Sequence, residues 1–134
     1  MTESAPVRRP PPLSPFMLWR WHVTMFTSIA HRATGVALYG AALILAGWAL
    51  SLASGSQAYG AYMALLGSPL GKLVLFGITG SAFYHLANGI RHLVWDVGHG
   101  LDVKTANASA WGVIIFAVVA SLAYWAWLFM TGAA

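Results

Sequence analysis

The chain has 134 residues, of which 59% are hydrophobic and only 7% are charged, and its formal net charge is +4. Soluble domains carry about 25% charged residues, so this composition excludes an ordinary soluble protein and indicates an integral membrane protein. The few basic residues are scattered between apolar segments instead of forming a dense patch, which excludes nucleic acid as a partner and favours a lipid bilayer.

The N-terminal region is expected to lie outside the hydrocarbon. Residues 1–13 are rich in proline and carry arginines, which predicts an extended arm. Residues 14–30 mix tryptophan, methionine and basic side chains, which predicts an interfacial helix leading into the first span. The arm has neither the apolar core of a cleavable signal peptide nor the character of an amphipathic presequence, and this favours a bacterial inner membrane.

The spacing of charges predicts an all-α integral membrane protein with three transmembrane helices in one domain. No residue between Arg32 and Lys72 is charged, and the apolar positions in this interval are enough for one crossing. Residues 55–69 are rich in glycine and serine and predict a connecting loop. The predicted spans cover residues 31–54, 70–97 and 108–130.

The basic residues also predict the orientation of the chain. Most of them precede the first span or lie between the second and third spans: Arg8, Arg9, Arg20, Arg32, Arg91 and Lys104. Lys72 alone lies on the other side. Because loops that face the cytoplasm carry the excess of lysine and arginine, the N-terminus is expected to be cytoplasmic and the C-terminus periplasmic.

The second span carries a stripe of small and polar residues at helical spacing: Gly77, Ser81, His85, Gly89, His92 and Asp96. His85 lies roughly 9 Å inward of Arg91, where water is scarce. Ser81 and Gly89 leave the backbone beside its imidazole bare, so a flat group can lie there. With no cysteine in the chain, a metal would need histidine.

These features predict that His85 ligates haem iron through one ring nitrogen, while the other nitrogen is oriented by an acceptor. No other span contains a histidine at this depth, so a second axial ligand would come from another polypeptide. The alternative is that His85 only hydrogen-bonds a neighbouring helix and that the small residues permit close helix packing.

Haem propionates in this setting need cationic partners near the membrane surface. Arg91 and His92 at one end of the second span, and His31 and Arg32 at the start of the first, are the candidates. Arg91 has an equally good alternative as a topology determinant that extends to the lipid headgroups. Asp96 lies one turn from His92, and its carboxylate is placed to neutralise a nearby cation.

A second motif, "SIAHRATG", covers Ser28 to Gly35. Its serine, histidine, arginine and last glycine share one helix face. Ser28 and Arg32 can donate hydrogen bonds to the carbonyl oxygens of a quinone near the water boundary, where protons are available. The alternative for Ser28 is a hydroxyl bonded to the backbone of its own helix.

Together, "RP" at Arg9, "LSP" from Leu13, "SIAHRATG" and "YHLANGIRHLVWD" resemble the cytochrome b membrane-anchor subunit of succinate dehydrogenase (complex II), the larger of its two anchors. The resemblance implies that His85 is one axial ligand of haem b and that the smaller anchor subunit supplies the other. It also implies that Ser28 and Arg32 line a ubiquinone pocket beside the iron-sulfur subunit. His31 and His92 would then lie near the propionates.

The chain itself lacks the groups needed to oxidise succinate. It has three acidic residues, no cysteine for iron-sulfur clusters and no glycine-rich nucleotide loop. We therefore expect dehydrogenation to belong to the flavoprotein subunit of a succinate:quinone oxidoreductase in the respiratory chain and tricarboxylic acid cycle. Two other hypotheses stay open at this point: a haem-free anchor of the fumarate reductase type, and a small transporter subunit that uses its histidines as a proton relay.

Overall fold

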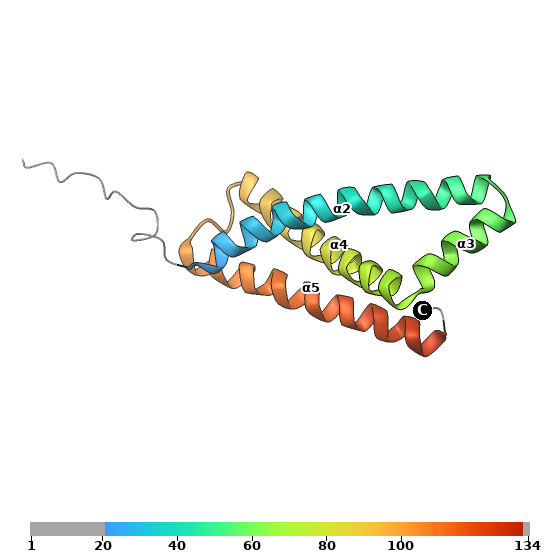
Figure 1. Cartoon of the computed structure of the whole chain (residues 1–134). Helices are drawn as coiled ribbons and strands as arrows, with labels where there is room; N and C mark the ends of the chain where they lie inside the picture. Colours follow the sequence, from blue (N-terminus) through green and yellow to red (C-terminus); the bar gives the residue numbers. More distant parts are fainter. Residues whose placement is uncertain (1–20, 133–134) are drawn as a thin grey trace, which may run out of the picture.

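The structure is a computed structural model that describes residues 21–132, and these residues are almost entirely helical (Figure 1). The helices are α2 (Val23–Ala53), α3 (Ser56–Gly67), α4 (Pro69–Asp96) and α5 (Val103–Thr131). No strand occurs in this part of the chain. The predicted all-α fold class is confirmed. The predicted arm, 1–13, and residues 14–20 of the predicted interfacial helix lie outside the described residues.

Three of the helices, α2, α4 and α5, are long and apolar enough to cross a membrane. They contain 31, 28 and 29 residues, so the prediction of three spans is confirmed. Two of the helices extend beyond the predicted spans: residues 23–30 belong to α2, and residues 103–107 belong to α5. In Figure 1, α2 and α5 flank α4, which packs against both.

The predicted connecting loop at residues 55–69 is wrong, because most of this segment forms the helix α3. Its interior is rich in alanine, leucine and methionine, which favour a helix, whereas turn-forming residues mark its ends. Gly55 adopts a φ of 104°, a left-handed conformation that suits glycine and reverses the chain after α2. The composition of the segment led to the wrong prediction, because it contains both turn-forming residues and residues that favour a helix.

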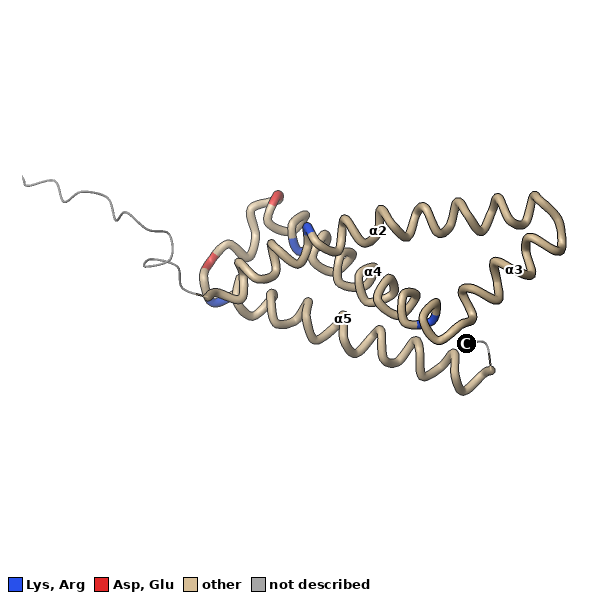
Figure 2. The backbone as a smooth tube through the Cα atoms, in the orientation of Figure 1, with Lys and Arg blue, Asp and Glu red and all other residues tan. Residues whose placement is uncertain are grey.

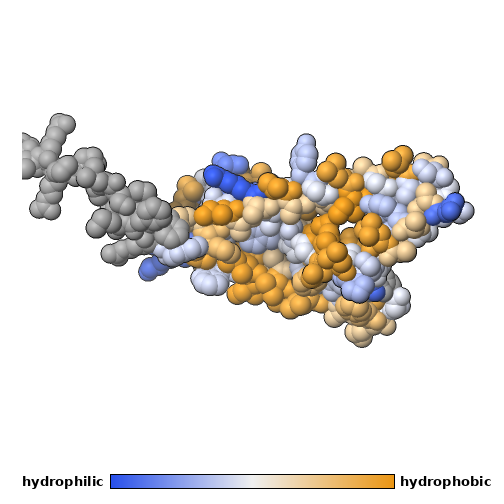
Figure 3. Space-filling view, in the orientation of Figure 1, coloured by the Kyte–Doolittle hydropathy of each residue, from blue (hydrophilic) through white to orange (hydrophobic). Residues whose placement is uncertain are grey.

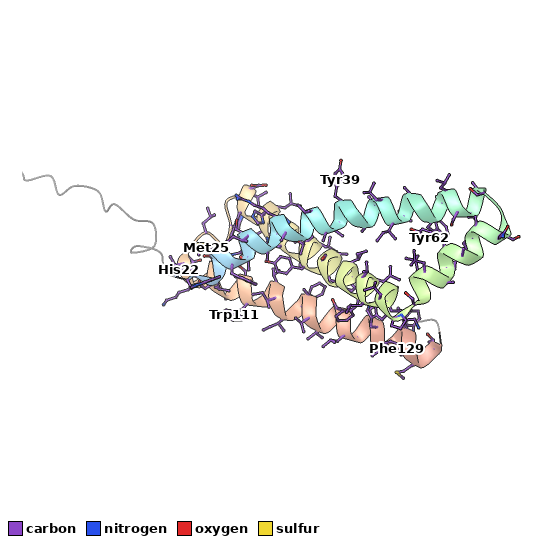
Figure 4. All side chains as sticks on the ribbon, viewed as in Figure 1. His22, Met25, Tyr39, Tyr62, Trp111 and Phe129 are labelled. Carbon is purple, nitrogen blue, oxygen red and sulfur yellow. The ribbon has the colours of Figure 1, made fainter. Side chains whose placement is uncertain are left out.

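A hydrogen bond from Tyr62 anchors α3 to α2. The tyrosine lies in the angle between the two helices (Figure 4), and its hydroxyl donates to the carbonyl oxygen of Ile44 at 2.7 Å. Gly47 permits this approach, since a Cβ at that position would lie only 2.8 Å from the tyrosine oxygen. The helix therefore folds back along α2 instead of extending away from it.

Side-chain caps define the beginnings of α4 and α5. The hydroxyl oxygen of Ser68 accepts a hydrogen bond from the backbone N–H of Gly71 at 3.1 Å, and Pro69 occupies the first helical position. Asp102 caps α5 by accepting from the N–H of Thr105 at 3.0 Å. Hydrogen bonds from the side chain and the backbone of Thr105 lower the pKa of the Asp102 carboxyl.

The interior of the described bundle is small. A cluster of Tyr84, Val113 and Ala117 joins α4 to α5, and Ala30 of α2 packs against it. Most large apolar side chains are exposed instead; Tyr39, for example, is 79% exposed and points away from the bundle (Figure 4). Apolar residues also cover much of the face seen in Figure 3. Such a surface suits lipid and partner helices rather than water.

Replacement of Gly71 by alanine is expected to destabilise the corner between α3 and α4. The new Cβ would lie against the backbone carbonyl groups of Leu65 and Leu66, which cannot move without displacing α3. Overpacking of this kind costs about 1–3 kcal/mol. Thermal unfolding of the purified protein in detergent measures this loss of stability. Gly60→Ala is the control, because its Cβ would meet no atom within 4 Å, and equal melting temperatures for the two variants would contradict the prediction.

Candidate functional site

The imidazole of His85 extends from the middle of α4 toward α2. Its Nδ1 lies 3.2 Å from the carbonyl oxygen of His31 and 3.2 Å from the hydroxyl of Thr34. A carbonyl can only accept, so a hydrogen bond to the His31 carbonyl forms in the tautomer that carries the proton on Nδ1. The Nε2 atom forms no hydrogen bond with any residue from 21 to 132. Its lone pair is therefore available to a ligand.

Two predicted motifs meet at this histidine. The ring of His31 stacks on the ring of His85, with a centroid distance of 4.0 Å and an interplanar angle of 24°. A Cβ at Gly35 would lie 3.2 Å from Cε1 of His85, so the glycine lets the imidazole rest on the backbone of α2. The glycine that ends "SIAHRATG" thus has a packing role that the sequence alone did not reveal.

His92 completes a cluster of stacked imidazoles, which we call the histidine cluster: His31, His85 and His92. The His92 ring lies 5.1 Å from that of His31 at an angle of 16°, and its Nδ1 is 2.7 Å from the carbonyl oxygen of Asn88. Among the described residues, no group of three or more side chains is arranged to hold a metal ion. Stacked rings present their faces to one another, so their nitrogens do not converge on one point.

The surface of α4 beside His85 is open. A Cβ at Gly77 or at Gly89 would meet nothing within 4 Å, and the hydroxyl of Ser81 donates to the carbonyl oxygen of Gly77 at 2.8 Å. A shallow groove of about 370 Å³ continues from here between α2 and α4. It is lined by Ala37, Gly40, Ala41, Ile44, Val74, Gly77, Ile78 and Ser81. A flat apolar group therefore meets little steric hindrance on this face.

Arg91 lies between the helices, and only 6% of it is exposed. Its hydrogen bonds reach Ser109 Oγ at 2.8 Å, the Ala106 carbonyl at 2.9 Å, and both Thr27 Oγ1 and Asn88 Oδ1 at 3.3 Å. The guanidinium also lies 3.9 Å above the ring of Trp95. It ties α2, α4 and α5 together. The contact of Arg91 with a haem propionate stays a prediction. To make that contact, the guanidinium would have to share or exchange some of these hydrogen bonds.

The remaining predicted residues differ in their surroundings. Asp96 is exposed and forms no ion pair with Arg91 or His92 in the described part of the chain. Ser28 is half-buried and Arg32 is exposed, one turn apart on α2. Neither side chain hydrogen-bonds to another described residue, so the backbone-bonded alternative for Ser28 is absent from this conformation. Both can donate to a molecule outside the chain.

Sequence reasoning missed several polar residues around the cluster: Thr27, Thr34, Asn88 and Ser109. Tyr84 extends their network by donating from its hydroxyl to the carbonyl oxygen of Thr27 at 2.8 Å. Thr34 and Asn88 stand inside the two motifs as polar residues in apolar segments, and this signal could have revealed them. Thr27 and Ser109 lie outside both sequence motifs. Only the packing of the helices brings them to Arg91.

Comparisons with known proteins show the family of the chain. The family model described as the succinate dehydrogenase/fumarate reductase transmembrane subunit matches residues 7–124. The chain belongs to this family. The succinate dehydrogenase cytochrome b556 subunit of Rickettsia felis is 35% identical over 115 residues, which are 85% of this chain and 90% of the relative.

Two further relatives come from different sources. The mitochondrial cytochrome b560 subunit of Sus scrofa is 38% identical over 117 residues, covering 83% of this chain and 68% of the relative. The cytochrome b556 subunit of Paracoccus denitrificans is 33% identical over 109 residues, covering 81% of this chain and 84% of the relative. The protein is a succinate dehydrogenase cytochrome b membrane anchor, and the predicted family is confirmed.

Replacement of Arg91 by methionine is expected to loosen the packing of α2 and α5 on α4. Four hydrogen bonds are lost, and at about 0.6 kcal/mol each inside a membrane the cost is roughly 2 kcal/mol. Unfolding of the purified protein by denaturing detergent measures the decrease in its free energy of unfolding. Lys104→Met is the control, since Lys104 is an exposed cation near the same end. Equal stability of the two variants would show that Arg91 does not hold the three helices together.

Proposed function

We propose that this anchor holds one haem b jointly with a second, smaller anchor subunit and forms part of the ubiquinone-reduction site of a succinate:quinone oxidoreductase. The observation that carries the proposal is the state of His85. Its Nδ1 lies 3.2 Å from the His31 carbonyl oxygen, and the tautomer that donates this hydrogen bond leaves Nε2 as a neutral, unbonded donor to iron. The names of the relatives, cytochrome b556 and b560 subunits, support the same cofactor.

The residues around His85 fit a haem. The hydrogen bond to His31 fixes the ring orientation and raises the basicity of Nε2, as at other histidine–iron sites. The open surface at Gly77 and Gly89 leaves room for a macrocycle. His31 and His92, with Arg91 one residue before the latter, would pair with the propionates at the charged end of the bundle. When bound, haem supplies a reversible one-electron couple.

The second axial ligand would come from the smaller anchor subunit. The ring of His31 stacks on that of His85, and the ring of His92 stacks on that of His31, so their nitrogens do not converge with Nε2 of His85 on one point among the described residues. A residue on a facing helix of that subunit would hold the haem together with His85. That helix would also cover part of the apolar surface that the described bundle leaves exposed.

The quinone would bind at Ser28 and Arg32. The hydroxyl and the guanidinium can each donate to one carbonyl oxygen of the ubiquinone headgroup, and both lack partners among the described residues. Reduction to the quinol takes two electrons and two protons. The electrons would come from succinate through the flavoprotein and iron-sulfur subunits, and the protons from water near the membrane surface.

We further propose that the chain lies in a bacterial inner membrane, and the distribution of its charges supports one orientation. The charged residues Arg32, Arg91, Asp96, Asp102 and Lys104 gather at one end of the described bundle, and Lys72 stands at the other (Figure 2). The positive-inside rule places the first end in the cytoplasm. The soluble subunits would dock there, the N-terminus would be cytoplasmic, and the C-terminus would be periplasmic.

His85→Ala is expected to abolish the b-type band in a dithionite-reduced minus oxidised spectrum of the purified complex, because no other nitrogen occupies that position. His99→Ala is the matched control, since His99 is exposed in the turn after α4, and it should keep the full band. A wild-type complex without any band would favour the haem-free anchor. Proton flux through the chain without a redox partner would favour the proton relay.

Ser28→Ala and Arg32→Leu are expected to lower succinate:ubiquinone reductase activity about tenfold or more, the effect of losing a hydrogen bond worth roughly 1.5 kcal/mol. Succinate-dependent reduction of a water-soluble dye, which tests the soluble subunits, should be unaffected, and the haem band should persist. Ser54→Ala, at the far end of α2, is the control. Full quinone reduction in both variants would place the quinone elsewhere.

A further inference from the structure

Lys72 stands at the end of the described bundle opposite the histidine cluster, without a counter-charge. The acidic residues in the described part of the chain are Asp96 and Asp102, and both lie near the turn between α4 and α5 at the other end (Figure 2). The Lys72 side chain is half-buried, and its ammonium makes no bond with any residue from 21 to 132. A half-buried cation in a membrane protein calls for an anionic partner.

Two apolar grooves meet at this lysine. One has a volume of about 370 Å³ and lies between α3, α4 and α5, where Met63, Leu75 and Leu128 form its walls. The other has a volume of about 520 Å³ and lies on the far side between α4 and α5, with Leu73, Phe76 and Phe129 along it. Both volumes fall in the range of about 300–1,000 Å³ typical of ligand sites. Lys72 and Trp125 line both grooves.

Trp125 separates the two grooves and is held rigidly. Only 8% of it is exposed, its indole N–H donates to the hydroxyl of Thr79 at 3.2 Å, and its ring packs edge-on against Phe76 at 5.7 Å. Because the polar atom of the indole is already bonded, the boundary between the grooves is apolar. The charge of Lys72 is then the main polar feature that the two grooves share.

We propose that this end of the chain binds one anionic phospholipid, with the phosphate at Lys72 and one acyl chain in each groove. A molecule with one negative headgroup and two apolar chains matches one cation at the junction of two apolar grooves. A transmembrane helix of a partner is about 10 Å wide, and an apolar one would leave the charge of Lys72 unmatched. The site is far from the histidine cluster, so it does not depend on the proposed haem or quinone.

Lipid retention by the intact purified complex tests the site. The complex is delipidated, incubated with equal amounts of phosphatidylglycerol and phosphatidylcholine in detergent, and weighed by native mass spectrometry. Lys72→Gln is expected to lower retained phosphatidylglycerol about fivefold, the effect of one basic residue near an anionic lipid, and to leave phosphatidylcholine unchanged. Lys104→Gln, which removes an exposed lysine outside both grooves, should retain the wild-type amount.

Further variants distinguish a lipid site from a surface that binds a partner helix. Lys72→Arg keeps the charge and should retain phosphatidylglycerol at close to the wild-type level, and the mass of every variant complex in the same spectra reports that the complex is assembled. A photo-cross-linking residue in place of Ala126, which lines the second groove, should capture phospholipid. Equal retention by Lys72→Gln and wild type would overturn the proposal. Capture of a partner polypeptide at position 126 would overturn it as well.

Discussion

The contact between His85 on α4 and the backbone of α2 is the interaction on which the candidate site depends. Inside a bilayer no water satisfies a polar ring nitrogen, so Nδ1 needs a protein acceptor, and the carbonyl of His31 provides it at 3.2 Å. Gly35 makes the approach possible because any larger residue would meet the imidazole. This contact joins the two helices beside His85 and leaves Nε2 without a partner among the described residues.

A second polar cluster holds the third helix in place. The guanidinium of Arg91 reaches Thr27 on α2 and Ser109 on α5, so a buried charge links the two helices that flank α4. A charge at this depth is costly unless it is hydrogen-bonded, and here the bonds are supplied by hydroxyls, amides and carbonyls instead of a carboxylate. Arg32, on α2, has the opposite surroundings: it is exposed and unbonded within the described residues.

The small interior of the bundle explains why so much of the molecule faces outward. The described bundle is closely packed mainly along a narrow seam between α4 and α5, which includes Tyr84 and Ala117. The hydrophobic effect does not drive these three helices together inside a bilayer, since lipid tails are as apolar as leucine. Polar contacts and small residues therefore specify how the helices pack, and the outward faces remain available to partner subunits and phospholipid.

Much of this architecture follows from the sequence. Apolar segments between charges determine the number of spans, because a bilayer admits only helices or closed barrels. The spacing of His85 and His92 places them on one helix face, and the two motifs together indicate the family. The helix α3 was missed, because glycine and serine at its ends masked an interior that favours a helix. Residues 1–20 lie outside these conclusions about structure.

What only the tertiary structure decided is which side chains meet across helices. Sequence spacing relates residues along one helix, whereas the rotation and depth of one helix against another depend on packing over its whole length. For this reason Arg91 was expected at the membrane rim but lies buried against Ser109, and Thr34 was not predicted as a site residue but contacts His85. Likewise, the sequence shows Lys72 as a lone charge, and the fold alone shows that two apolar grooves meet beside it.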